Sequence, residues 1–252
     1  MKNLVIFKLA SDENSQQEIL QKYAENGILA TFITPLVFAF KNLKEWGAVL
    51  QGEKENFLGI IFTSPRSVEA SLEALSHGNS LHSSWHTAHN YCVGPTTSQL
   101  VSSKLGLQCQ GEDSGNAEVL SAYILEDMAS KGFTKGTFLF PCGNLKLGIL
   151  ERKLQEGGFF VQPFEIYETI CNPELEDDFE KNFPKEAEYL LFYSPSCVAF
   201  SLPILRKRRE NVEKLKFIAI GPSTKKSIED AGIEVFRACE KPTLEHVLKE
   251  LS

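Results

Sequence analysis

The sequence contains no uninterrupted apolar run of about 18 residues, the length that a membrane-spanning helix requires. It also lacks the glycine-rich patterns GxGxxG and GxxxxGK followed by Ser or Thr, whose backbone amides bind the phosphates of nucleotides. The net charge of −7 argues against broad nucleic-acid binding, which needs a basic face. We therefore expect a globular protein that binds neither a membrane nor nucleic acid.

The six cysteines form no CxxC pair, and most of them lie among apolar residues. Buried free thiols in a reducing compartment are the expected state. The N-terminal segment MKNLVIFKLASDENSQQ has only a short apolar core, turns acidic and polar, and shows no small-residue cleavage site. It predicts a first β-strand rather than a secretory signal, and hence a cytoplasmic protein.

The two halves of the chain repeat one pattern. FTSPRSVEA from Phe62 and FYSPSCVAF from Phe192 each follow an apolar run, and their separation is roughly half the length of the chain. Nearly the same separation lies between the glycines of YCVGPTT and FIAIGPST, Gly94 and Gly221. The segments NGILATFITPL and GGFFVQPFEIY repeat at a similar offset. Landmarks in the same order at nearly the same spacing indicate an internal duplication.

Each half alternates between strands and helices. Apolar runs such as LVIF, LGIIF, TFLF and YLLFY have the length and composition of buried strands, and amphipathic helical segments separate them. This alternation predicts two doubly wound α/β lobes with parallel sheets and helices on both faces. The segments TPLVFAF and FEIYETI look extended, and they are either members of a sheet or paired crossings between the lobes.

Ligands of parallel α/β sheets bind beyond the carboxyl ends of the strands. Here those ends carry Ser, Thr or Asn near a predicted helix start, with Pro where its missing N–H does no harm. We expect free backbone amides and helix dipoles to bind an anion there, although ordinary helix capping explains any single loop. The expected site is a cleft between the lobes for a substrate with many carboxylates or phosphates. The strand ends are Thr63-Ser64-Pro65, Gly94-Pro95-Thr96-Thr97, Pro141-Cys142-Gly143-Asn144, Ser194-Pro195-Ser196 and Gly221-Pro222-Ser223-Thr224.

The segments FTSPRSVEA, VGPTTSQLVSSKLGL, GNAE, LFPCGN, IYET, FYSPS and KFIAIGPST resemble the uroporphyrinogen-III synthases of the animal type, over essentially the whole chain. The resemblance implies two flavodoxin-like lobes joined by a two-stranded β-ladder. Residues 1–35 and 172–252 would form one lobe, residues 38–168 the other, and residues 35–38 and 168–172 the linkers.

The resemblance also implies a lyase of haem biosynthesis that uses no metal or organic cofactor. It would dehydrate and close hydroxymethylbilane, a linear tetrapyrrole, to uroporphyrinogen III with inversion of the last ring through a spiro intermediate. Because this substrate closes unaided to the uninverted isomer, positioning should carry most of the catalysis. A monomer that receives its substrate from hydroxymethylbilane synthase is expected. The alternative is a non-enzymatic two-lobe receptor for a polyanionic small molecule.

Tyr167 is the predicted catalytic residue, because by resemblance it assists loss of the hydroxyl group. With an ordinary pKa of about 10, a phenol is a weak acid at neutral pH but a good hydrogen-bond donor. The alternative is an aromatic ring that only packs between the lobes. For Arg66 and Lys216 the alternative is a solvated surface charge. Relatives often carry a second basic residue where this chain has Lys146-Leu147, and this departure weakens the expectation of a carboxylate contact there. The predicted substrate-binding residues are Thr63, Ser64, Arg66, Thr97, Asn116, Ser194, Lys216, Ser223 and Thr224.

Two further signals are not assigned a function. His82, His86 and His89 have a spacing that would suit a metal on a helix, but their segment is polar and short of carboxylates, so a surface connection is expected and no metal site. The basic run LRKRRE from Leu205 is interpreted as a solvated helix face rather than a localisation signal.

Overall fold

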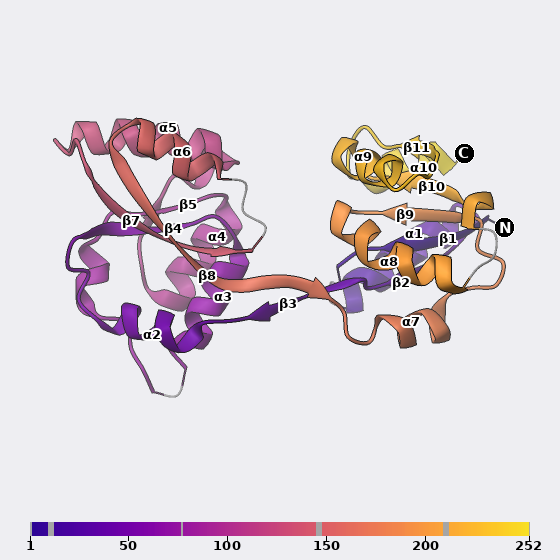
Figure 1. The fold of residues 1–252 in the computed structure, drawn as a ribbon, viewed down its shortest axis with the longest axis horizontal. Helices are drawn as coiled ribbons and strands as arrows, with labels where there is room; N and C mark the ends of the chain where they lie inside the picture. The colour runs from indigo at the N-terminus through magenta and orange to yellow at the C-terminus, as the bar shows by residue number, and fades with distance from the viewer. Residues whose placement is uncertain (1, 10–12, 77, 145–147, 209–211, 252) are drawn as a thin grey trace. The chain divides into compact units, whose positions relative to one another are not determined.

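The chain divides into two compact units. Unit 1 comprises Met1–Val37 and Ile170–Ser252, and unit 2 comprises Phe38–Thr169. The structure, a computed structural model, describes residues 2–9, 13–76, 78–144, 148–208 and 212–251. Figure 1 shows β1 (Lys2–Phe7) of unit 1, drawn in indigo, in one sheet with strands from the orange and yellow C-terminal part of the chain.

Eleven strands are present in the described residues: β1 (Lys2–Phe7), β2 (Ile28–Ile33), β3 (Leu36–Phe40), β4 (Phe57–Phe62), β5 (Asn90–Cys92), β6 (Cys109–Gln110), β7 (Gly136–Gly143), β8 (Phe159–Cys171), β9 (Tyr189–Phe192), β10 (Lys216–Ala219) and β11 (Val235–Ala238). The α-helices in those residues are α1 (Glu13–Glu25), α2 (Leu43–Gln51), α3 (Pro65–Ala74), α4 (Pro95–Leu100), α5 (Ala117–Ser130), α6 (Ile149–Glu156), α7 (Leu175–Asn182), α8 (Pro195–Arg208), α9 (Pro222–Asp230) and α10 (Leu244–Leu251). Short helices of other kinds are η1 (Ser83–Thr87), η2 (Val101–Leu105), η3 (Glu112–Ser114) and η4 (Val212–Lys214).

The two sheets have the same strand order once the duplication is taken into account. Unit 1 has the order β11-β10-β9-β1-β2, and its strands pair in parallel. Unit 2 has the order β6-β5-β4-β7-β8, with parallel pairing, followed by β3 at the edge. Since β4 and β9 are the repeated strands, the units match when unit 1 is counted from β9. Counted in this way, β1 is the fourth strand of unit 1, although it comes first in the chain. The strand order of unit 1 is therefore a cyclic permutation of that of unit 2.

Two neighbouring strands, β3 and β8, carry the chain between the units. They are adjacent in the sheet of unit 2, and the N–H of Lys41 donates to the carbonyl of Ile166 at 2.9 Å just beyond β3. The ammonium of Lys41 pairs with Glu165 at 2.9 Å. On the unit 1 side, the side chain of Asn172 donates to Thr34 and its N–H donates to Pro35. The extended segments are thus paired crossings that also belong to the sheet of unit 2.

The central strands of unit 2 are buried on both faces. Ile60 and Phe62 of β4 pack with Trp46 of α2 and Val68 of α3 in one apolar cluster. Ile61, which points to the opposite face, packs in a second cluster with residues of α5 and α6. Continuous apolar runs therefore form these strands because each side chain in the run has a core to enter.

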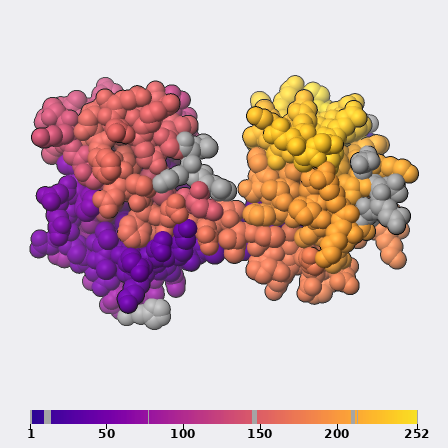
Figure 2. All heavy atoms as spheres, in the orientation of Figure 1, coloured from indigo at the N-terminus to yellow at the C-terminus, as the bar shows by residue number. Residues whose placement is uncertain are grey.

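A row of stacked rings covers one face of the sheet in unit 1. The ring centroids of Phe7 and Phe192 are 4.5 Å apart, those of Phe192 and Phe217 are 5.6 Å apart, and Phe179 of α7 continues the row at 5.6 Å from Phe7. The opposite face packs on α1 and α10. In Figure 2 the visible surface of unit 1 comes mostly from orange and yellow residues, and the β1 side chains Leu4–Phe7 are fully buried.

The predicted fold class is confirmed, because both units are α/β with parallel sheets and flanking helices. In chain order, unit 1 has the flavodoxin-like order 2-1-3-4-5. The six cysteines are free thiols, as predicted, and four of them are buried. Among the described residues, no helix combines the length and apolarity needed to cross a membrane.

Asn90 at the start of β5 is a buried polar residue that joins three parts of unit 2. Its side-chain oxygen accepts from the N–H of Ile60 at 3.0 Å, and its amide nitrogen donates to the carbonyl of Trp85 at 3.0 Å. Only 2% of Asn90 is exposed, so neither bond can be replaced by water in the folded chain.

We predict that Asn90→Ala lowers the free energy of unfolding of unit 2 by about 2–4 kcal/mol, because two buried backbone groups lose their partners. Both tryptophans of the chain, Trp46 and Trp85, lie in the core of unit 2, so urea unfolding followed by tryptophan fluorescence reports on this unit. Asn79→Ala is the control, since the exposed Asn79 side chain donates to the carbonyl of Ser76 and makes no other hydrogen bond within the described residues. Equal midpoints for the two variants would contradict the prediction.

Candidate functional site

A pocket of about 310 Å³ lies at the carboxyl edge of the sheet in unit 2. It is bounded by the ends of β4 and β7, the two strands between which the strand order reverses. At such a point the loops after the two strands diverge to opposite faces of the sheet, and a crevice opens between them. The pocket therefore occupies the position where α/β folds bind their ligands.

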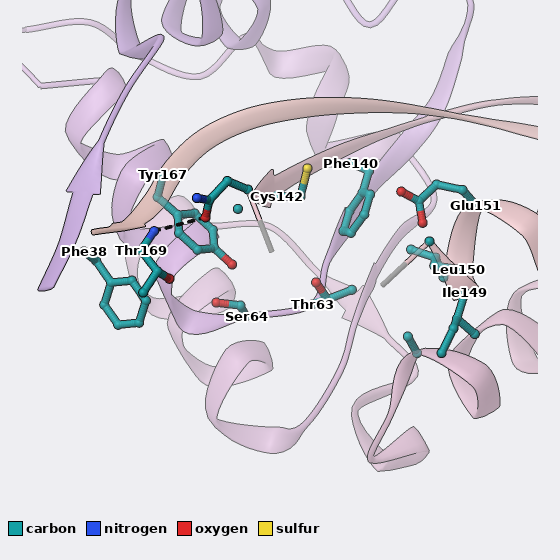
Figure 3. Close-up of a pocket in the computed structure, with 14 residues that line it drawn as sticks. Phe38, Thr63, Ser64, Phe140, Cys142, Ile149, Leu150, Glu151, Tyr167 and Thr169 are labelled. Carbon is teal, nitrogen blue, oxygen red and sulfur yellow. Dashed lines mark hydrogen bonds between the residues drawn. The ribbon is translucent and has the colours of Figure 1, made fainter. Parts of the chain in front are cut away.

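Aromatic and aliphatic side chains form most of the pocket wall. In Figure 3, Phe38, Tyr167 and Ser64 lie on one side, and Phe140, Leu150 and Glu151 lie on the other. The polar groups are few, as in most small-molecule sites. The polar lining residues are Thr63, Ser64, Asn144, Glu151, Tyr167 and Thr169.

The ring of Tyr167 takes its position from an irregularity between β7 and β8. The register shifts between Cys142 and Gly143, so that Gly143 is opposite Tyr167. A Cβ atom added to Gly143 would lie 2.5 Å from Cε2 and 2.9 Å from Cζ of Tyr167. The absence of a side chain at position 143 therefore gives the Tyr167 ring its place against the strand.

Beside this ring, the side chain of Asn144 ties the ends of β7 and β8 together. Its Oδ1 accepts from the N–H of Thr169 at 3.1 Å, the bond drawn as a dashed line in Figure 3. The mouth of the pocket is thus held by a side-chain-to-backbone bond where the strand ladder ends.

Thr63 and Ser64 follow β4 and enter the pocket from the start of α3. The Ser64 hydroxyl oxygen accepts from the N–H of Arg66 at 3.0 Å, and the carbonyl of Ser64 accepts from the N–H of Ser67 at 3.1 Å. Ser64 is therefore a helix cap as well as a pocket residue. The predicted residues Thr63, Ser64 and Tyr167 are brought together in one pocket.

Arg66 lies next to the pocket rather than in its wall. Its guanidinium carbon is 4.7 Å from the ring centroid of the lining residue Phe38, and Nη1 donates to both carboxylate oxygens of Glu69 at 3.0 and 2.9 Å. Asn116 caps α5 by accepting from the N–H groups of Glu118 and Val119, one residue before the lining residue Ala117.

The equivalent edge of unit 1 has different side chains. Ser194 repeats the cap, since its hydroxyl oxygen accepts from the N–H of Cys197 at 3.2 Å. Tyr193 stands where unit 2 has Thr63, and the ammonium of Lys8 lies 4.8 Å from the centroid of its ring. Burial raises the pKa of Tyr193, with a smaller contribution from Cys239, and burial also raises the pKa of Cys197.

Free helix-start amides are fewer than the sequence predicts. The caps of α3, α5 and α8 use N–H groups at their own helix starts. By contrast, α4 and α9 have a glycine at the cap and no side-chain bond, and within the described residues the N–H groups of Thr97 and Thr224 have no protein acceptor. The side chains of Thr97 and Thr224 are themselves buried, and Ser223 is exposed in the first turn of α9. Among the described residues, each unit thus keeps one helix start with a free backbone amide, α4 after Gly94-Pro95 in unit 2 and α9 after Gly221-Pro222 in unit 1.

The predicted substrate-binding role of Lys216 is corrected by its position in the structure. It begins β10, so it lies at the amino end of that strand, about five residues and roughly 16 Å before Gly221 at the carboxyl end. Its ammonium donates to the hydroxyl of Tyr189 at 3.1 Å and lies 5.3 Å from the ring centroid of Phe236. Because the ligand edge of the sheet is the carboxyl edge, Lys216 is on the wrong side of unit 1 for the predicted role.

Several pocket residues receive no individual role from the sequence. Gly143 and Asn144 belong to one of the strand ends expected at the site, whereas around Phe38 the sequence indicates only an extended segment. The alternation of β3 is the signal that places Phe38 on the pocket side, once its pairing with β8 is known. Lys146 and Leu147 lie outside the described residues, as do Arg209 and Glu210 of the basic run.

The three histidines face different partners. His82 accepts from the N–H of Ser84 at the start of η1, His86 lies 3.2 Å from the carbonyl of Gly106, and His89 packs against Phe133. In the part of the chain that the structure describes, no cluster of three or more His, Cys, Asp or Glu side chains could hold a metal ion. The segment connects α3 to β5 through η1, and His86 is exposed.

Comparisons with known proteins agree on one family. The family model described as uroporphyrinogen-III synthase HemD matches residues 17–249. A uroporphyrinogen-III synthase of Saccharomyces cerevisiae is 27% identical over 198 residues, which are 73% of this chain and 71% of the yeast protein. A uroporphyrinogen-III synthase of Chlorobaculum parvum is 29% identical over 189 residues, covering 71% of this chain and 72% of that protein.

Solved structures support the fold. The uroporphyrinogen-III synthetase of Helicobacter pylori superposes with a TM-score of 0.65 at 16% identity, over 99% of this chain and 97% of that one. A mutant uroporphyrinogen III synthase of Thermus thermophilus gives a TM-score of 0.58 at 16% identity, over 100% of this chain and 96% of that one.

We predict that Gly143→Ala displaces the ring of Tyr167 and lowers the free energy of unfolding by about 1–3 kcal/mol, because the new methyl group and the ring cannot share the same space. Ring proton contacts between Phe38 and Tyr167, seen by NMR, should weaken. Gly52→Ala is the control, since an added Cβ there meets only carbonyl oxygens at 3.4 and 3.5 Å. An unchanged Phe38–Tyr167 contact in Gly143→Ala would show that the glycine is not needed for this arrangement.

Proposed function

The chain belongs to the uroporphyrinogen-III synthase family, and we propose that it closes hydroxymethylbilane to uroporphyrinogen III at the pocket of unit 2. The observation that carries this proposal is the family match over residues 17–249, together with a pocket at the switch point that contains Tyr167. The products belong to porphyrin and haem biosynthesis. Family membership does not favour the alternative of a non-enzymatic receptor.

The first step that we propose is loss of the terminal hydroxyl group of the substrate. The pyrrole nitrogen supplies electrons as the carbon–oxygen bond breaks, and loss of the pyrrole N–H proton leaves a neutral azafulvene. The hydroxyl group takes up one proton and departs as water, so the step releases no net proton. The phenol of Tyr167 donates a hydrogen bond to the departing oxygen. Because the pyrrole provides the driving electrons, a hydrogen-bond donor is sufficient and a strong acid is not required.

The second step is closure with inversion. The substituted α-carbon of the last ring forms a bond to the azafulvene methylene carbon and gives a spiro intermediate. The bond from that α-carbon to its original methylene bridge then breaks, which leaves a second azafulvene on the neighbouring ring. The freed methylene carbon bonds to the free α-carbon of the last ring, which loses its proton while the azafulvene nitrogen regains one. The apolar walls formed by Phe38, Phe140 and Leu150 exclude water, which would otherwise capture the azafulvene and return the substrate. The same walls restrict the conformers of the last ring, and this positioning accounts for most of the catalysis.

The carboxylates of the substrate need donors, although the chain has a net charge of −7. We propose that the amides at the starts of α4 and α9, near Thr97, Ser223 and Thr224, bind carboxylates of the substrate. At the pocket, carboxylates are bound by the hydroxyls of Thr63 and Ser64 and by the guanidinium of Arg66. Asn116 and Ser194 add polar groups at the starts of α5 and α8. Supporting observations are the unpartnered amides at the two glycine caps, within the residues that the structure describes, and the position of Arg66 on Phe38.

We further propose that the chain acts as a monomer in the cytoplasm, without a cofactor, and receives its substrate directly from hydroxymethylbilane synthase. The free thiols support a reducing compartment. Direct transfer is favoured by the substrate's own tendency to close without inversion.

The reaction product decides between the two functions. We predict that the purified chain converts hydroxymethylbilane mainly to the type III isomer, measured by oxidising the product and separating type I from type III porphyrin by chromatography. Formation of type I alone, at the rate of the reaction without protein, would favour the receptor instead.

We predict that Tyr167→Phe lowers kcat by about 10–100-fold and changes KM by less than about three-fold, because the lost hydrogen bond acts mainly as the hydroxyl group departs. Tyr123→Phe is the matched control, since the exposed Tyr123 hydroxyl lies outside the pocket and donates to Gln110 at 3.4 Å. Unchanged turnover in Tyr167→Phe would dispose of the catalytic role and leave Tyr167 as a packing residue.

A further inference from the structure

Phe38 contacts both side chains to which the proposed function gives a task near the reacting end of the substrate. We infer that Phe38 is a positioning residue that holds the guanidinium of Arg66 and the ring of Tyr167 in their productive places, and so sets the ratio of inverted to uninverted product. This inference rests on the proposed function. Phe38 is the first residue of unit 2, and it lies on the connecting strand β3.

The first contact leaves one edge of Arg66 ready for a carboxylate. The guanidinium carbon lies 4.7 Å from the Phe38 ring centroid, and Nη1 is engaged by both oxygens of Glu69. The Nε and Nη2 groups of Arg66 have no protein acceptor among the described residues. Nε and Nη2 form the fork that binds a carboxylate with two parallel hydrogen bonds.

The fixed position of Arg66 matters because a free arginine side chain loses rotamer freedom when it binds. Phe38 packs on one face of the guanidinium and Glu69 binds one end of it. Part of the side-chain entropy of Arg66 is therefore lost when the protein folds, and less remains to be lost when a carboxylate binds. Arg66 side-chain exposure is 33%, so without Phe38 the guanidinium would be able to swing into solvent. Phe38 therefore makes a carboxylate of the substrate bind at one defined place.

The second contact orients Tyr167. The two rings meet edge to face, with centroids 6.1 Å apart and an interplanar angle of 85°. Tyr167 is confined on another side by Gly143, where no side chain intervenes. Figure 3 shows Phe38 and Tyr167 on the same side of the pocket, near Ser64. One phenylalanine thus fixes the relation between a carboxylate anchor and the donor that acts on the hydroxyl group.

An aliphatic side chain cannot replace this ring. Leucine would fill similar apolar space but has neither the negative ring face that attracts a cation nor the edge-to-face partner for Tyr167. Phe40 provides a comparison on the same strand, because it is 40% exposed and makes no ring or cation contact within the described residues.

The test compares Phe38→Leu, Phe38→Tyr and Phe40→Leu in the full-length chain. We predict that Phe38→Leu raises KM by about ten-fold, lowers kcat by a few-fold and increases the share of type I product. The ring-retaining Phe38→Tyr and the control Phe40→Leu should keep the wild-type values. Equal thermal unfolding of the three variants shows that the differences do not come from loss of fold.

A double-mutant cycle with Arg66→Met separates positioning from simple packing. If Phe38 acts through Arg66, then Phe38→Leu in the Arg66→Met background raises KM by less than about two-fold. Single-variant effects on KM that multiply in the double variant would overturn the inference, as would a Phe38→Leu variant that behaves like Phe40→Leu.

The final measurement does not depend on turnover. The ¹⁵Nε order parameter of Arg66, measured by NMR, should fall in Phe38→Leu and stay at the wild-type value in Phe40→Leu. An unchanged order parameter in Phe38→Leu overturns the positioning role. If the wild-type chain formed only type I product, the proposed function would fail, whereas the order parameter would still decide whether Phe38 holds Arg66.

Discussion

Parallel pairing of strands that are buried on both faces is the constraint on which the rest of this structure depends. Ile60 and Ile61 enter different cores on opposite faces of one sheet, so their strand cannot carry polar chemistry along its length. Polar residues are therefore confined to the strand ends, and parallel pairing gathers the carboxyl ends at one edge. The reversal of strand order between β4 and β7 then opens the pocket. The site follows from the topology before any catalytic residue is considered.

Much of this arrangement can be predicted from sequence because it depends on local patterns. The apolar runs predict buried strands, and the duplicated FTSPR and FYSPS segments predict two similar sheets. Ser64 follows from its place at a strand end, whereas Tyr167 is predicted only through the resemblance to the family. The cyclic order of unit 1 follows from the duplication combined with the strand pairing. The same information leaves open whether Ser64, Asn116 and Ser194 cap α3, α5 and α8 or leave the amides free, because that choice depends on side-chain rotamers.

The errors and omissions come from long-range geometry. Lys216 stands in a motif shared with the family, but its position at the amino end of β10 depends on where the strand begins. The pairing of Gly143 with Tyr167 depends on a register shift that the sequence does not reveal. Phe38 and Arg66 belong to different elements, with α2 and β4 between them in the chain, and their contact depends on the neighbouring positions of β3 and β8.

Whether an acidic chain can bind an anion depends on the hydrogen-bond donors near the site rather than on the net charge of the chain. Arg66 is paired with Glu69, so the pair contributes little field at a distance while the guanidinium keeps a directional edge. Backbone amides at the glycine caps add donors that carry no formal charge. Donors of this kind can bind an anion without adding to the net charge of the chain.

The cyclic permutation of unit 1 also determines the order in which the protein can be assembled on the ribosome. Unit 2 is contiguous, so all its strands are available once Thr169 has been made, except for the last two residues of β8, Ile170 and Cys171. Strand β1 emerges first but needs β9 as a neighbour, and the paired residues Leu4 and Tyr189 are separated in the chain by the whole of unit 2. During translation the apolar β1 segment therefore stays without half of its sheet until most of the chain has been synthesised. The β1 segment thus needs protection from aggregation during this time.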